Sequence, residues 1–117
     1  MLTALGKDLR KLRIDRGVNM MEMAKAIGLS TAMLSAIETG RKRVPGDFVD
    51  RLERAYPDLI ARRAQIEALI NLANREVRVS LDEATEDDAV LVTELARRFS
   101  DFTDGQKDSL RNLLKKR

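Results

Sequence analysis

The chain has 117 residues and a net charge of +3, with 44% hydrophobic, 35% charged and 3% aromatic residues, a mixture that suits a soluble, helix-rich protein. It contains no Cys and no His, which excludes disulfides, thiol nucleophiles, Cys/His zinc sites and every catalytic dyad or triad built on histidine. No motif gathers carboxylates with a nucleophile or a phosphate-binding loop, so we expect no enzyme activity, no metal ion and no cofactor.

The sequence also lacks the patterns that direct a chain into a membrane. The N-terminal segment MLTALGKDLRKLR mixes charged and apolar residues and has no continuous apolar core like that of a signal peptide. No stretch approaches the roughly 18 consecutive apolar residues of a membrane-spanning helix. We therefore expect a cytoplasmic protein.

Positive charge is concentrated in the first half of the chain. Residues 1–57 contain 11 Lys/Arg and 7 Asp/Glu, whereas residues 58–117 contain 11 Lys/Arg and 12 Asp/Glu. A basic half followed by a nearly neutral half suggests a nucleic-acid-binding module followed by an interaction module.

Turn and capping residues divide the first half into four predicted helices. The first ends at Gly17, and Asn19 followed three residues later by Glu22 predicts a capping box for the second. Gly28 ends the second helix in a left-handed turn, and Ser30 caps the third.

The third predicted helix ends at Gly40, and Pro45 is placed at the start of the fourth. Apolar residues at helical spacing predict the core of these four helices. They are Leu5, Leu9, Leu12, Met23, Ala24, Ile27, Leu34, Ile37, Phe48, Leu52 and Tyr56.

Residues 57–81 contain two further predicted elements. Pro57-Asp58 starts a longer helix, and residues 77–81 then alternate strictly between apolar and polar types, which predicts one short strand. The apolar stripe of the helix is Leu59, Ile66, Leu69, Ile70 and Ala73.

Two more helices are predicted in the remainder. The acidic run at residues 82–88 favours the N-terminus of a helix, and Thr103 with Gln106 forms a capping-box pattern for the last one. Their apolar positions are Leu91, Leu95, Phe99, Leu110, Leu113 and Leu114.

The segment LRKLRIDRGVNMMEMAKAIGLSTAMLSAIETGRKRVP carries a family pattern: leucine-arginine pairs, a glycine before the second helix, an alanine inside it, a glycine at the turn, and then I-E-x-G. On this pattern, residues 5 to about 57 resemble the lambda-repressor/Cro-like (XRE) helix-turn-helix family of bacterial and phage transcription regulators. The resemblance implies a mostly α protein with a four- to five-helix DNA-binding domain at residues 1–57. Residues 58–117 are expected to form a helical dimerisation or interaction region that includes the short strand.

The resemblance also implies roles for individual residues. Arg13 and Glu38 match a pair that forms a partly buried salt bridge between the first and third helices. The positions that face the major groove are Thr31, Ala32, Ser35 and Ala36. The positions that meet the DNA backbone are Met20, Ser30, Thr39, Arg41, Lys42 and Arg43, although a basic turn that is merely solvated is the alternative for the last three.

Two positions depart from the family pattern. The start of the second helix, usually a glutamine that binds phosphate, is Met20, which leaves its backbone N–H as the phosphate donor. Position 36, often long and polar, is alanine. The reading helix therefore offers no bidentate base contact. It offers only the hydroxyls of Thr31 and Ser35 and methyl contacts from alanine, so selectivity must be shared with DNA shape and water.

The predicted strand suggests how two copies of the chain associate. A lone strand must satisfy its backbone groups elsewhere, and pairing with the same strand of a second copy would place Val77, Val79 and Leu81 at a dimer interface. An extended linker without pairing is the alternative. The helical second half is also loosely similar to the C-terminal extensions of small regulators of this family.

Three functions fit these observations. The first is a dimeric, sequence-specific repressor that binds duplex DNA at a palindromic operator and also controls its own promoter. The second is an antitoxin-like protein that binds DNA through its first half and a partner protein through its second. The third is an accessory protein that keeps the fold but has lost DNA binding, as the alanine-rich reading helix would allow.

Overall fold

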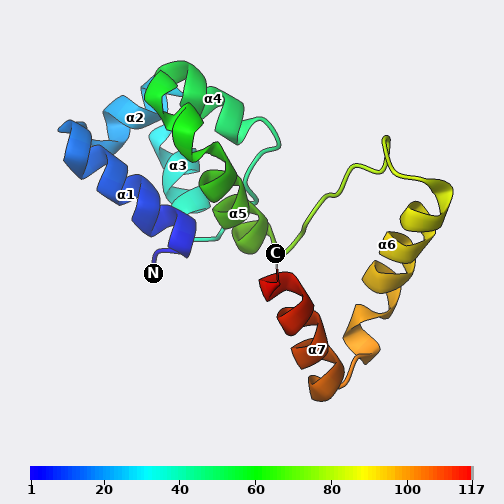
Figure 1. The fold of residues 1–117 in the computed structure, drawn as a ribbon. Helices are drawn as coiled ribbons and strands as arrows, with labels where there is room; N and C mark the ends of the chain where they lie inside the picture. Colours follow the sequence, from blue (N-terminus) through cyan, green and yellow to red (C-terminus); the bar gives the residue numbers. More distant parts are fainter. Residues whose placement is uncertain (117) are drawn as a thin grey trace. The chain divides into compact units, whose positions relative to one another are not determined.

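A computed structural model describes residues 1–116, and throughout this range the only regular structure is helical, so the prediction of a mostly α protein is confirmed (Figure 1). The chain divides into two compact units, residues 1–77 and residues 78–117. The first unit consists of α1 (Ala4–Arg16), α2 (Met20–Ala26), α3 (Thr31–Glu38), α4 (Phe48–Ala55), the 3-10 helix η1 (Pro57–Arg62) and α5 (Arg63–Asn74). The second consists of α6 (Glu86–Arg98), the 3-10 helix η2 (Phe99–Asp101) and α7 (Asp104–Lys115).

The predicted caps define the ends of the first helices. Asn19 and Glu22 form a complete capping box at the start of α2, and Ser30 accepts a hydrogen bond from the Met33 backbone N–H at the start of α3. Gly28 has φ +76°, a left-handed conformation that turns the chain between these two helices. The local sequence therefore determines both the length of α2 and the entry into α3.

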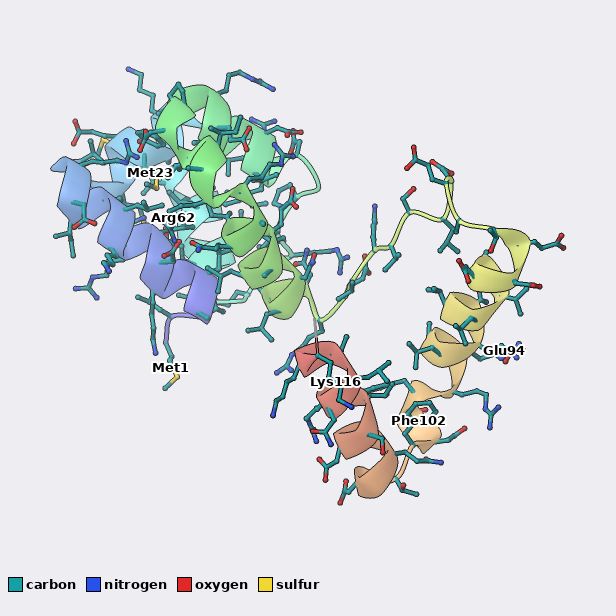
Figure 2. All side chains as sticks on the ribbon, viewed as in Figure 1. Met1, Met23, Arg62, Glu94, Phe102 and Lys116 are labelled. Atoms are coloured by element: carbon teal, nitrogen blue, oxygen red, sulfur yellow. The ribbon has the colours of Figure 1, made fainter. Side chains whose placement is uncertain are left out.

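The core of the first unit is continuous and includes residues from both sides of position 57. All the predicted core positions of α1, α2 and α3 are buried, and Tyr56 is half-buried. The fully assembled core is Leu5, Leu9, Leu12, Met23, Ala24, Ile27, Leu34, Ile37, Val44, Phe48, Val49, Leu52, Leu59 and Ile66. Figure 2 shows Met23 among the helices of this unit.

Helices η1 and α5 are attached to the preceding helices by both apolar and ionic contacts. Ile66 is fully buried, and Arg62 Nη2 lies 2.9 Å from Asp8 Oδ1 of α1. Arg16 of α1 forms an ion pair with Asp58, and this hydrogen bond lowers the pKa of the Asp58 carboxyl. Hydrogen bonds to the carboxylates of Asp50, Glu67 and Glu53 raise the pKa of Arg63. The compact unit consequently extends to residue 77.

Two helix starts differ from the sequence predictions. The segment expected to begin a single long helix at Pro57 forms the 3-10 helix η1 before α5 begins at Arg63. Helix α4 begins at Phe48, three residues after Pro45, because a turn in which the Phe48 N–H donates to the Pro45 carbonyl comes first.

The prediction of a strand at residues 77–81 is wrong. No strand is present within residues 1–116, and Val77 and Val79 are 70% and 60% exposed. Alternation describes which side chains would share a face, but a strand also needs a neighbouring strand for its backbone hydrogen bonds. The described chain contains no second extended element that could supply one.

The second unit is a pair of capped helices joined by a short turn. Thr85 accepts a hydrogen bond from the Asp88 backbone N–H at the start of α6, and Thr103 and Gln106 form the predicted capping box of α7. Acidic residues occupy the first turn of α6 and basic residues its last turn, as the helix dipole favours.

No helix within residues 1–116 has the length and apolar character needed to cross a membrane.

Candidate nucleic-acid interface

The exposed side of α3 carries the residues that the sequence predicted to face DNA. Thr31 and Ala32 are exposed, and Ser35 and Ala36 are partly exposed, one turn farther along the helix. The opposite side carries Leu34 and Ile37, both fully buried. The structure therefore brings the four predicted residues to one side of a short helix. Their side chains are all small.

Helix α3 is fixed to α1 by a buried ion pair. Arg13 contacts Glu38 with both guanidinium nitrogens, at 2.5 Å from Nη1 to Oε2 and 3.0 Å from Nη2 to Oε1. Glu38 is fully buried and Arg13 is 7% exposed, so neither side chain is available to DNA. A bidentate pair of this kind fixes orientation as well as distance. The pair predicted from the resemblance is thus present as an internal connection.

The end of α3 also lies very close to the start of α1. A Cβ added to Gly6 would lie 2.3 Å from the Glu38 carbonyl oxygen, so only glycine fits there. The same carbonyl accepts hydrogen bonds from the Thr3 backbone N–H (2.9 Å) and from the Thr3 hydroxyl (3.2 Å). Together these contacts hold α3 rigidly at the surface of the domain.

The loop after α3 carries three exposed basic residues, Arg41, Lys42 and Arg43. The backbone N–H groups of the first two donate to the Ala36 carbonyl at 2.9 and 3.2 Å, which folds the loop back against the helix. Arg41 Nε donates to the Thr39 hydroxyl at 3.1 Å. We refer to residues 41–43 as the basic loop.

Asn74, the last residue of α5, and Glu76, just beyond the helix, contact the basic loop and the residue that follows it. Asn74 Oδ1 accepts a hydrogen bond from the Val44 N–H (2.9 Å), and Asn74 Nδ2 donates to the Val44 carbonyl (3.2 Å). Glu76 Oε2 lies 2.8 Å from Arg43 Nη2. The basic loop is therefore fastened at its C-terminal end by residues that lie about thirty positions farther along the chain.

Neither Asn74 nor Glu76 belongs to a sequence motif that would connect it with the site. Both follow the apolar stripe of α5, where a polar residue normally indicates a solvated helix end. The nearby Arg75 has φ +55°, the left-handed conformation that ends α5 and directs Glu76 back toward the loop. No local sequence pattern encodes a contact of this range.

The remaining predicted positions lie in different surroundings. Met20 begins α2, and its side chain packs against the core. Thr39 directs its hydroxyl toward the Ser35 and Ala36 carbonyls, at 3.0 and 3.3 Å. Residues 77–81, including the three positions expected at a dimer interface, have no regular secondary structure, and Val77 and Val79 are exposed.

Comparison with known proteins identifies the first part of the chain. A family model described as a helix-turn-helix domain matches residues 4–57, the span from α1 to Pro57. Residues 4–57 are therefore a helix-turn-helix domain, in agreement with the lambda-repressor/Cro-like resemblance. No curated protein and no solved structure matches the chain.

Proposed function

We propose that the protein is a sequence-specific transcription regulator, a homodimeric repressor that acts in the cytoplasm on a palindromic operator, including that of its own promoter. One observation carries this proposal: the exposed side of α3 bears small side chains directly beside a basic loop that is fastened to the domain. A rigid reading helix next to fixed positive charges is the arrangement that a helix-turn-helix protein uses in the major groove.

Small side chains allow the helix backbone to approach the bases closely. Thr31 and Ser35 supply hydroxyls that can donate to or accept from base edges, and Ala32 and Ala36 supply methyl groups that suit a thymine methyl. Each of these contacts is weaker than a bidentate pair. Selectivity therefore depends also on the shape and deformability of the operator.

The basic loop supplies the affinity that does not depend on sequence. Lysine and arginine side chains that neutralise phosphates release counterions from the duplex. Arg43 begins from an ion pair with Glu76, so a DNA phosphate must replace a carboxylate that is already in place. Binding by Arg43 is therefore weaker than binding by an arginine without an acidic neighbour.

Dimerisation follows from the size of the reading surface. A single short helix contacts too little DNA for tight specific binding, and helix-turn-helix proteins commonly use two half-sites related by a twofold axis. A second copy doubles the contacts and requires a palindromic site.

The proposal is tested by replacing Arg41, Lys42 and Arg43 together with alanine. Affinity should fall for all DNA sequences, and the slope of log affinity against log salt should flatten by about 2 to 3, since each phosphate contact contributes about 0.9. Binding is measured by fluorescence anisotropy over a salt series, and a melting curve verifies that the variant is folded. A triple variant that binds as tightly as the parent at moderate salt would show that the basic loop is not the anchor.

A further inference from the structure

The helices of the second unit have apolar faces but no core. None of the residues described in α6, η2 or α7 is buried. Leu91 of α6 remains 66% exposed, and Leu114 of α7 remains 79% exposed. Helices of this length gain most of their stability in water by packing an apolar face against another element. The apolar faces of α6 and α7 therefore require a further surface.

The apolar faces line a single groove. The two helices diverge from η2 (Figure 1), and between them lies an open groove of about 790 Å³. Its apolar lining includes Leu91, Leu95, Phe99, Phe102, Leu110 and Leu114. The rings of Phe99 and Phe102, 5.9 Å apart, lie at the turn, where Figure 2 labels Phe102. Glu94, Arg98 and Arg111 also border the groove. An apolar centre with a charged border is typical of a protein–protein interface.

The second unit is nearly neutral, so its net charge favours a partner that is not strongly charged. Residues 78–117 contain eight Lys/Arg and nine Asp/Glu, a balance of −1, so neither DNA nor an anionic membrane is attracted to this unit. Within it the charges are ordered. Helix α6 begins with Glu86, Asp87 and Asp88 and ends with Arg97 and Arg98.

Helix α7 repeats this order of charge. Its first half carries Asp104 and Asp108 with Lys107 between them, and its second half carries Arg111 and Lys115, followed by Lys116 at the C-cap. When two such helices lie antiparallel, the acidic end of each meets the basic end of the other. The unit is thus complementary to itself, in charge as well as in apolar character.

We propose that the groove receives the α6–α7 hairpin of a second copy of this chain. Two hairpins related by a twofold axis form an antiparallel four-helix bundle, in which the leucines and phenylalanines of both grooves make one core. The inference rests on the proposed dimeric regulator and names the surface that makes it dimeric. The interface then lies in α6 and α7, and residues 77–81 connect it to the DNA-binding domain.

The test compares two adjacent substitutions in the full-length protein. Leu91→Asp places a carboxylate in the groove, whereas Val90→Asp adds the same charge to a half-exposed residue that does not line it. Sedimentation velocity without DNA should show a dimer for the parent and for Val90→Asp at micromolar concentration. Leu91→Asp should weaken the dimer by about tenfold or more, as removal of an apolar anchor does. Circular dichroism should show a loss of helix in Leu91→Asp only.

Two outcomes would overturn the inference. A monomeric parent would mean that the groove serves a different protein or a small molecule, and an equally stable Leu91→Asp dimer would place the interface elsewhere. Because association is measured without DNA, the proposed function is tested separately. A dimer that binds no DNA contradicts the regulator but not the interface. A monomer that binds DNA contradicts the interface and the proposed dimeric state, but not the proposed DNA binding.

Discussion

Ala36 lies on the side of α3 that we propose to face DNA, where the size of the side chain would decide how closely the helix approaches the bases. It is partly exposed, on the side opposite Leu34, and its carbonyl holds the basic loop through backbone hydrogen bonds that a substitution leaves intact. Ala36→Glu should therefore abolish specific DNA binding by steric clash and repulsion from phosphates. The melting temperature should stay close to that of the parent, because the core is unchanged.

Thr31→Ala is the matched mild substitution on the same helix. Loss of one hydroxyl contact should weaken DNA binding by about 1 kcal/mol. Affinity for the selected operator and melting temperature should be measured for both variants. Full operator affinity in Ala36→Glu would place the reading surface elsewhere, whereas loss of both affinity and folding would show that Ala36 is a core position.

Single residues were predictable from the sequence where their roles depend on near neighbours. Asn19 and Glu22 are three positions apart, so the capping box they form is visible in the sequence itself. The Arg13–Glu38 contact spans 25 positions, and only the resemblance to a known family suggested it. The role of Asn74 could be predicted neither from near neighbours nor from the family resemblance. Its partner is the backbone of a residue 30 positions away that has no distinctive side chain.

At the scale of elements, α5 acts as the support of the basic loop. Asn74→Ala removes both hydrogen bonds to the Val44 backbone, and Val44 is buried, so its N–H and carbonyl lose partners that water cannot easily replace. The free energy of unfolding should fall by about 1–3 kcal/mol. DNA affinity should fall for all sequences, because the basic loop is no longer held. Urea denaturation and anisotropy measure the two effects.

Glu76→Gln is the control for this element, since it leaves Asn74 in place and removes the charge opposite Arg43. Stability should change by less than about 1 kcal/mol, because the ion pair is exposed. DNA affinity should rise at low salt, because phosphate no longer competes with a carboxylate. Unchanged DNA affinity in Asn74→Ala would show that α5 does not position the loop. Lower affinity in Glu76→Gln would show that Glu76 holds Arg43 for DNA and does not compete with phosphate.

The strand predicted at residues 77–81 is absent because a strand depends on a partner outside its own sequence. Helices satisfy their own backbone hydrogen bonds, so periodicity and caps were sufficient to find α6 and α7. Residues 77–81 have the alternation of a strand, but pairing depends on a second element that alternation does not reveal. The groove between α6 and α7 could not be predicted from the sequence either. The sequence shows which residues are apolar, but not whether another surface covers them.

At the scale of the whole molecule, the boundary between the two units predicts where the chain can be cut. Within residues 1–116, all fourteen hydrophobic core residues lie from Leu5 to Ile66, and the Asn74 contact lies before residue 77. A fragment of residues 1–77 should therefore fold with a melting temperature close to that of the DNA-binding unit in the intact chain. Because the proposed dimer forms through α6 and α7, this fragment should be monomeric and should bind operator DNA more weakly than the intact chain.

A fragment of residues 1–57 is the matched comparison, because it retains every residue of the helix-turn-helix family match. It loses Leu59 and Ile66, whose burial contributes about 1.5–3 kcal/mol each. It also loses Arg62 of η1, which pairs with Asp8, and Asn74 of α5, which bonds to the Val44 backbone. Since whole domains are stable by only about 5–15 kcal/mol, this fragment should be largely unfolded in thermal denaturation followed by circular dichroism. Equal stability of the two fragments would contradict the role assigned to α5, and an unfolded 1–77 fragment would show that the second unit is needed to stabilise the first.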